Sequence, residues 1–185
     1  MRAMRYWLLK SEPEVYSIDD LKRDKSTLWT GVRNYQARNS MMGPDGIAML
    51  IAEALKAKKK TAAKNGPTME PGDLILFYHS NAEPAGCAGV GRIERVGIPD
   101  PEQFSKKSEY HEPKATKEKP MWFCAEVSFQ ERFQHLVSLD EIRRDKSLQK
   151  MVLLQKGSRL SVQLVAANEF EHVASLGRAS AGSGE

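Results

Sequence analysis

Five apolar runs at irregular spacing constrain the fold of this chain more than any other feature. Each is rich in aliphatic or aromatic residues and is bounded by turn-forming residues, which is typical of strands. The runs are residues 6–10, 74–80, 87–96, 121–129 and 160–165. The fourth strand is expected to continue toward Leu136, and residues 28–29 are expected to form a further short strand. Short helical patterns separate them, and there is no internal repeat. The spacing predicts an α+β domain in which short peripheral helices surround a curved mixed β-sheet or small barrel.

Capping patterns predict where several helices begin. A small polar residue followed three residues later by a carboxylate can form a capping box. Each of the two side chains then accepts a hydrogen bond from the backbone N–H of the other residue. Ser17 with Asp20, Ser138 with Glu141, and Asn168 with Glu171 have this spacing. The helices expected are therefore 18–23, 139–144 and 168–177, together with 35–42, 47–60 and a further turn within 148–154.

The chain is long enough to bury a substantial core, and we expect one domain over residues 4–176. Residues 43–68 have the character of an insert. Apolar side chains recur there at helical spacing from Ile47, and a lysine run follows. This pattern predicts a solvated helix packed loosely on the body. The small and polar residues 177–185 predict a disordered tail.

The charge balance favours an anionic partner on only part of the surface. The formal net charge is +4. Five lysines against two carboxylates give residues 43–68 a charge of +3, so the remaining chain has only +1. A nucleic-acid surface would therefore be a local patch of the molecule.

Composition also argues against several classes of protein. No apolar run approaches the about 20 residues of a membrane helix, and the first residues lack the pattern of a signal peptide. Cys87 and Cys124 are the only cysteines, and neither has a metal ligand at the usual spacing. Cys124 is expected to be buried in a strand. We expect an intracellular monomer without membrane, metal or cofactor, cytoplasmic if bacterial and nuclear if eukaryotic.

The stretch from Trp29 to Asn39 has the composition of a binding site. It holds two aromatics, two arginines and two asparagines, with hardly an aliphatic side chain among them. Flat rings stack on bases, guanidinium groups pair with phosphates, and amides suit the edge of a base. For any one of these residues, a capped turn leading into a short helix is the simpler interpretation. The set as a whole favours binding.

An enzymatic alternative is raised by His79 beside Ser80, with His79 as an acid or base acting on a modified nucleotide or RNA. Neighbouring strand residues point to opposite faces, so these two cannot form a serine–histidine pair without a bend. The sequence also lacks the G-x-S-x-G and H-E-x-x-H motifs. A binding module is favoured, and the enzyme remains the alternative.

Several motifs of this chain closely resemble those of the EVE domain. They are Tyr6-Trp7-Leu8-Leu9-Lys10-Ser11-Glu12-Pro13, residues 29–39, Gly72-Asp73, Phe77-Tyr78-His79-Ser80, Gly89-Val90-Gly91, Pro99-Asp100-Pro101, Trp122, and residues 157–162. The resemblance runs from Tyr6 to about Val173 and implies a PUA-like fold, a pseudo-barrel of mixed strands with peripheral helices. Residues 43–68 depart from the family pattern, since many members connect the two flanking motifs more directly.

This resemblance implies recognition of a modified base in DNA or RNA. EVE domains are similar to the YTH domain, which holds a methylated adenine in an aromatic cage. We therefore expect Trp29 to stack on a flipped-out base that is methylated or hydroxymethylated. Tyr35 or Tyr78 is expected to complete the cage. Trp7 is expected in the core, and Trp122 is compatible with either position.

The same comparison gives Thr30 as a polar contact beside the base. Selectivity for a modified base also needs polar groups at the base edge, and the residues expected there are Lys10, Ser11, Asn34, His79 and Ser80. Arg33 and Arg38 are expected to bind phosphate or to brace the loop rather than to touch the base.

Overall fold

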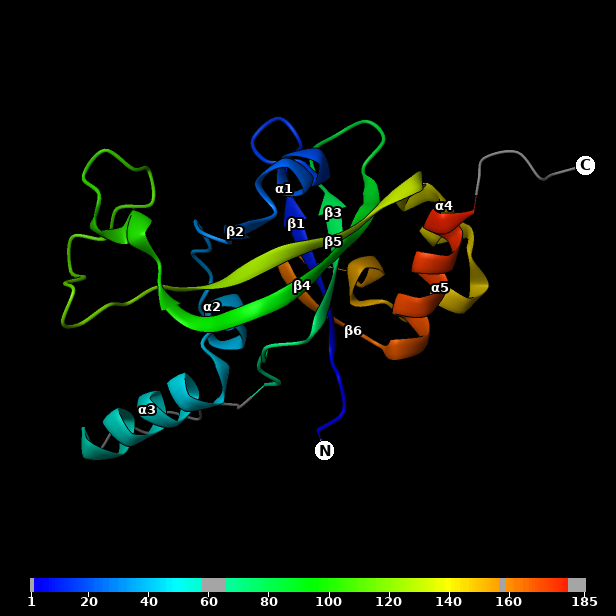
Figure 1. The fold of residues 1–185 in the computed structure, drawn as a ribbon. Coiled ribbons are helices and arrows are strands. Elements are labelled where there is room, and N and C mark those ends of the chain that lie inside the picture. The colour runs from blue at the N-terminus through cyan, green and yellow to red at the C-terminus, as the bar shows by residue number, and fades with distance from the viewer. Residues whose placement is uncertain (1, 58–65, 157–158, 180–185) are drawn as a thin grey trace, which may run out of the picture. The chain divides into compact units, whose positions relative to one another are not determined.

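A computed structural model describes residues 2–57, 66–156 and 159–179 (Figure 1). The strands are β1 (Tyr6–Ser11), β2 (Ser26–Leu28), β3 (Leu74–His79), β4 (Gly86–Pro99), β5 (Phe123–Ser138) and β6 (Val162–Val165). The helices are α1 (Ile18–Asp24), α2 (Tyr35–Met41), α3 (Gly43–Lys56), α4 (Leu139–Arg144) and α5 (Ala167–Arg178), with 3-10 turns η1 (Pro101–Phe104), η2 (Lys146–Leu148) and η3 (Val152–Leu154).

The strands form one mixed sheet in the order β2-β5-β4-β3-β1-β6. Strand β1 is parallel to β3 and antiparallel to β6, and β3 is antiparallel to β4. The sheet is open, because β2 and β6 end it without pairing with each other. This arrangement of a mixed sheet with short helices confirms the predicted α+β class.

The chain folds into two compact units. The first unit comprises residues 1–27, 72–92 and 128–185, and the second comprises residues 28–71 and 93–127. Strands β4 and β5 each contribute residues to both units. The single domain expected over residues 4–176 stays a prediction.

The first unit is built on the parallel pair β1 and β3. In the register of this pair, Leu8 lies beside Leu76 and Leu9 beside Phe77. All four side chains are fully buried. Strands covered on both faces read as nearly continuous apolar runs, which explains why these two were evident in the sequence. Figure 1 shows α5 as the red helix that follows β6 in this unit.

Asp73, just before β3, ties the N-terminal segment to this sheet. Its side chain is 1% exposed and accepts hydrogen bonds from Arg2 Nη2 at 2.6 Å, Arg5 N at 3.1 Å and Trp7 Nε1 at 3.0 Å. A buried carboxylate is tolerated only when such donors surround it. Trp7 is 2% exposed, which confirms its predicted place in the core.

Two of the three predicted capping boxes are confirmed. Ser17 with Asp20 begins α1 and Ser138 with Glu141 begins α4, each with both reciprocal hydrogen bonds. The third prediction was wrong, because α5 begins at Ala167 rather than after Asn168. Glu169 makes the reciprocal bond there, accepting from Ala166 N at 3.0 Å.

The expected end of the last helix near Gly177 is confirmed. Helix α5 continues through Gly177 to Arg178. A Cβ at position 177 would overlap the ring of Phe133, so this glycine permits close packing of α5 on β5 instead of ending the helix. Residues 180–185 of the expected tail lie outside the described residues.

The second unit contains α2, α3 and the connection between β4 and β5. Helix α3 begins at Gly43, four residues before the expected start at Ile47. Pro44 in its first turn has the backbone angle that a helix start needs, and Asp45 complements the helix dipole there. The exposed Met49 and Leu55 agree with loose packing of this helix. Residues 58–60 of the prediction lie outside the described residues.

Strand boundaries shifted in two places. The short strand expected at residues 28–29 is β2, at Ser26–Leu28, and β5 continues past the expected Leu136 to Ser138. Both cysteines are free and buried, and burial raises the thiol pKa of each to about 12.

None of the described helices is both long enough and apolar enough to cross a membrane.

Asp73→Ala is expected to lower the free energy of unfolding by about 3 kcal/mol, since the buried Trp7 Nε1–H then loses its acceptor. Urea unfolding of wild type and variant measures the difference. Asp140→Ala is the matched control, because Asp140 pairs with Arg143 at 3.2 Å where both side chains are largely exposed. Equal effects of the two substitutions would contradict the role given to Asp73.

Candidate nucleic-acid interface

In the second unit, the loop before α2 is organised by the buried carboxylate of Asp100. One oxygen, Oδ2, accepts from Gly31 N at 2.9 Å and from Arg33 Nη1 at 2.8 Å. The other, Oδ1, accepts from Glu102 N at 2.8 Å. Asp100 is 1% exposed, so these donors replace its water shell. Gly31 has φ +79, a conformation that glycine adopts without strain.

Arg33 braces this loop. Besides the bond to Asp100, Nη1 donates to Val32 O at 3.1 Å, while Nε and Nη2 donate to Tyr110 O at 3.2 and 2.6 Å. Four of its five N–H groups are therefore used within the second unit. Of the two roles expected for Arg33, the structure supports bracing.

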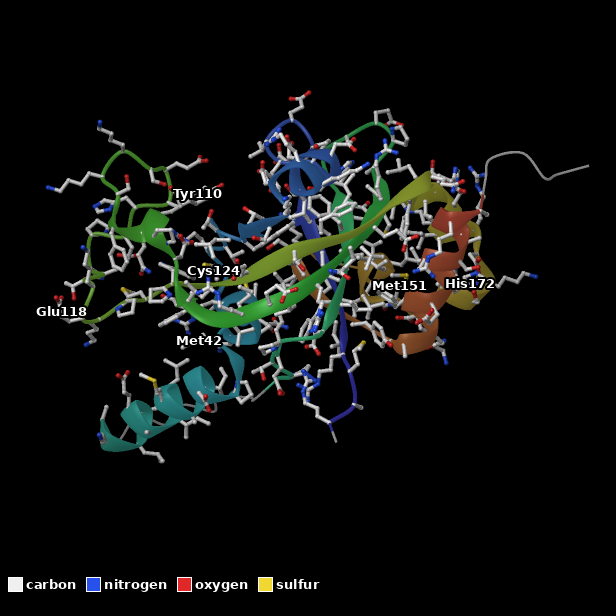
Figure 2. All side chains as sticks on the ribbon, viewed as in Figure 1. Met42, Tyr110, Glu118, Cys124, Met151 and His172 are labelled. Atoms are coloured by element: carbon white, nitrogen blue, oxygen red, sulfur yellow. The ribbon has the colours of Figure 1, made fainter. Side chains whose placement is uncertain are left out.

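Gln103 fixes the connection that carries Tyr110, which Figure 2 labels. Its side chain is 0% exposed. Oε1 accepts from Met121 N at 2.8 Å and Trp122 N at 2.9 Å, while Nε2 donates to Asp100 O at 2.9 Å and Trp122 O at 2.8 Å. This clamp was not predicted. A glutamine within a polar segment carries no signal of burial in the sequence.

The predicted base contacts of the second unit differ in exposure. Trp29 is 7% exposed, and its backbone N donates to Ala125 O at 2.8 Å. Thr30 follows at a half-buried position. Asn34 is exposed and caps α2, with Oδ1 accepting from Gln36 N at 2.9 Å and Ala37 N at 3.1 Å. Capping occupies the carbonyl of Asn34 and leaves its NH2 group to donate.

Tyr35, Arg38 and Trp122 form a stack in the second unit. The Tyr35 and Trp122 ring centroids are 5.0 Å apart with 21° between the planes. The Arg38 guanidinium carbon lies 4.8 Å from the Tyr35 centroid and 5.9 Å from that of Trp122. Arg33 lies 5.3 Å from the Trp122 ring. Trp122 is 6% exposed, and Tyr35 is 57% exposed.

The predicted base contacts of the first unit lie at the carboxyl ends of the parallel strands β1 and β3. Lys10 is opposite Tyr78 and Ser11 is opposite His79 in the register of this pair. Ser80 N donates to Ser11 O at 2.9 Å, which extends the pairing by one residue. The Ser11 hydroxyl donates to Tyr16 O at 2.7 Å.

His79 is an acceptor in this structure. Ile18 N, at the start of α1, donates to His79 Nε2 at 3.1 Å, so the proton of the neutral ring lies on Nδ1. Burial lowers the pKa of His79, against an opposing contribution from the Asp19 carboxylate. The lone pair that a general base needs is engaged by the helix, which disfavours the enzymatic alternative.

Lys10 and Tyr78 lie together at the strand ends. Tyr78 is 3% exposed within the core of the first unit, and burial raises its pKa to about 12. The Lys10 ammonium is 5.9 Å from the Tyr78 ring centroid, and burial lowers its pKa. Lys10 forms no ion pair with any residue that the structure describes. The predicted place of Tyr78 in an aromatic cage and that of Lys10 at the ligand both stay predictions.

Comparisons with known proteins identify the family. The profile of the EVE domain matches residues 5–45 and 55–176, and the gap between the two matched ranges falls within the predicted insert. Thymocyte nuclear protein 1 of Gallus gallus is 32% identical over 189 residues, which cover 92% of this chain and 68% of that protein. The fold is thus α+β of the PUA-like kind. The chain belongs to the EVE domain family.

Solved structures agree with this assignment. Human THYN1, determined in complex with DNA containing 5-methylcytosine, is 31% identical with a TM-score of 0.75, over 95% of this chain and 99% of that chain. A hypothetical protein from Leishmania major is 38% identical with a TM-score of 0.77, over 95% of each chain.

His79 makes the stability of the protein depend on pH. Its folded pKa is below the ordinary 6.5, so on acidification the unfolded chain binds the proton first. The contribution of His79 is therefore complete above pH 6.5 and is lost as the pH falls from there through the folded pKa. In His79→Gln this contribution disappears.

Denaturant unfolding of wild type and His79→Gln across this pH window measures the effect. The advantage of wild type is expected to shrink as the pH falls. Other titrating groups cancel in the difference between the two proteins. A difference that stays constant below pH 6.5 would contradict the role given to His79.

Proposed function

We propose that this protein is a non-enzymatic reader of nucleic acid that binds a methylated or hydroxymethylated base. The observation that supports this most is the likeness to human THYN1, whose structure is a complex with 5-methylcytosine-containing DNA. The similarity to human THYN1 covers 95% of this chain at 31% identity, so it extends over both units. DNA carrying 5-methylcytosine is therefore the first ligand to test, with methylated RNA as the alternative.

In the second unit, we assign stacking on the base to Trp29. Its 7% exposure means that a covering side chain must move before a base can stack on it. The Asn34 NH2 group and the Thr30 hydroxyl then serve as polar contacts to the base edge. The Asp100 network holds the backbone of this loop in place during that change.

In the first unit, we assign polar contacts to the ends of β1 and β3. The Lys10 ammonium can donate to a base carbonyl or a phosphate, and partial burial strengthens such a bond. The His79 Nδ1–H and the Ser80 hydroxyl are further donors. Ser11 keeps its predicted place, although its hydroxyl proton already serves Tyr16 O.

The test compares an oligonucleotide that carries one 5-methylcytosine with its unmodified twin. Wild type is expected to bind the methylated strand more tightly. Trp29→Ala should remove that preference and weaken binding by about 1–3 kcal/mol, which is the value of one stacked base. Fluorescence anisotropy of a labelled oligonucleotide measures both affinities.

Matched variants separate the ligand contacts from the fold. Trp29→Phe retains an aromatic ring and should keep part of the preference. Lys10→Met keeps the apolar stem and should weaken binding through the lost charge. Equal affinity of wild type for methylated, hydroxymethylated and plain strands would refute the proposed reading of these modifications.

A further inference from the structure

Trp122 is held firmly, yet its indole nitrogen finds no hydrogen-bond partner among the residues that the structure describes. The Gln103 side chain bonds both backbone groups of Trp122. Its Oε1 accepts from the Trp122 N–H, and its Nε2 donates to the Trp122 carbonyl. The Nε1 atom is buried and has no hydrogen-bond partner within the part of the chain that the structure describes. A buried indole N–H normally finds an acceptor. An unpaired donor at a rigid position therefore needs an explanation other than folding.

Arg38, in the same stack, is a cation without a carboxylate partner among the described residues. Its Nε and Nη2 donate to Asn39 Oδ1 at 3.0 and 2.7 Å, and Nη1 donates to Met121 O at 3.1 Å. These acceptors are neutral, and among the described residues Arg38 forms no ion pair. Burial takes part of the water shell from this cation and so lowers its pKa. An anion at this position would offset that loss.

Arg33 provides the internal contrast. It touches the same Trp122 ring, but its charge is neutralised by Asp100 at 2.8 Å. Of Arg33 in the loop and Arg38 in α2, only Arg38 has a charge without a carboxylate partner among the described residues. A ligand phosphate is therefore attracted to Arg38 rather than to Arg33.

Tyr35 supplies a platform beside this charge. Its ring stacks on Trp122 on one side, and the side chain is 57% exposed. A residue that served only the core would not leave so large an aromatic surface in solvent. Exposed aromatic faces beside cationic groups are the usual elements of single-strand binding surfaces.

We propose that Tyr35, Arg38 and Trp122 bind an unmodified nucleotide that flanks the modified base. Tyr35 stacks on the flanking base and Arg38 binds a phosphate. When Tyr35 shifts onto the base, an acceptor of the nucleotide reaches Trp122 Nε1. The inference rests on the proposed binding of nucleic acid and adds to it a site within the second unit that accepts any base, since every base has a stacking face.

The experiment measures two ratios for each variant with single-stranded DNA. One is the affinity relative to wild type, and the other is the preference for the 5-methylcytosine strand over its plain twin. Tyr35→Ala is expected to weaken both strands by the same factor of about 5 to 150, which is one stacking interaction. The preference ratio should stay unchanged. Tyr35→Phe, which keeps the ring, should match wild type.

Arg38→Gln tests the phosphate contact independently. It should weaken both strands and reduce the slope of log affinity against log salt by about 0.7, the value for one phosphate contact on a single strand. Arg38→Lys should keep the slope. Thermal melting of each variant confirms that the fold is retained.

Several outcomes would overturn the inference. If Tyr35→Ala and Arg38→Gln bind both strands with the affinity of wild type, the flanking site is excluded. A change in the preference ratio with Tyr35→Ala would place Tyr35 at the modified base instead. If wild type shows no preference while Tyr35→Ala weakens both strands, the flanking site stands and the modified-base function fails. No binding of either strand by wild type would overturn both.

Discussion

The buried carboxylate of Asp100 is the constraint on which the second unit depends. It joins two segments that are far apart in sequence, since it accepts from Gly31 and Arg33 of the loop before α2 and from Glu102 of its own turn. Gln103 continues the same network to Trp122. The loop can therefore be polar throughout and still have one conformation, because its donors are satisfied internally.

The polar residues of the predicted site are of two kinds. Arg33, the carbonyl of Asn34 and Nε2 of His79 are each engaged by neighbouring backbone or side-chain groups. Lys10 and Arg38 are partly desolvated cations that lack ion-pair partners among the described residues. Such charges rarely stabilise a fold, because hydrogen bonds to neutral acceptors do not offset the free energy that desolvation of the charge costs. The proposed nucleic-acid ligand would supply the anionic partners of these two cations.

Local patterns in the sequence predicted the structural features that depend on residues close together in the chain. The strands of the first unit follow from continuous apolar runs, and the starts of α1 and α4 follow from capping boxes that span four residues. The same logic failed at α5, where the carboxylate that caps the helix is Glu169 and not Glu171. Gly177 is of the residue type that commonly ends a helix. Its role inside α5 depends on the close contact with Phe133, which the sequence does not show.

The site was predicted in composition but not in arrangement. Motifs identified Trp29, Arg33 and Arg38, yet the different surroundings of the two arginines depend on Asp100 and Trp122, which lie more than sixty residues away in the chain. Gln103 was missed because nothing in a polar segment distinguishes a buried glutamine from an exposed one. Long-range partners of this kind are fixed by the tertiary fold.

The claim that Trp29 contacts the modified base is tested most directly by the indole N–H resonances of the three tryptophans during titration with oligonucleotide. The Trp29 signal is expected to shift more with the 5-methylcytosine strand than with its plain twin. Trp7, whose indole is bonded to Asp73, should not move. A Trp29 signal that stays in place at saturation with the methylated strand would contradict the claim.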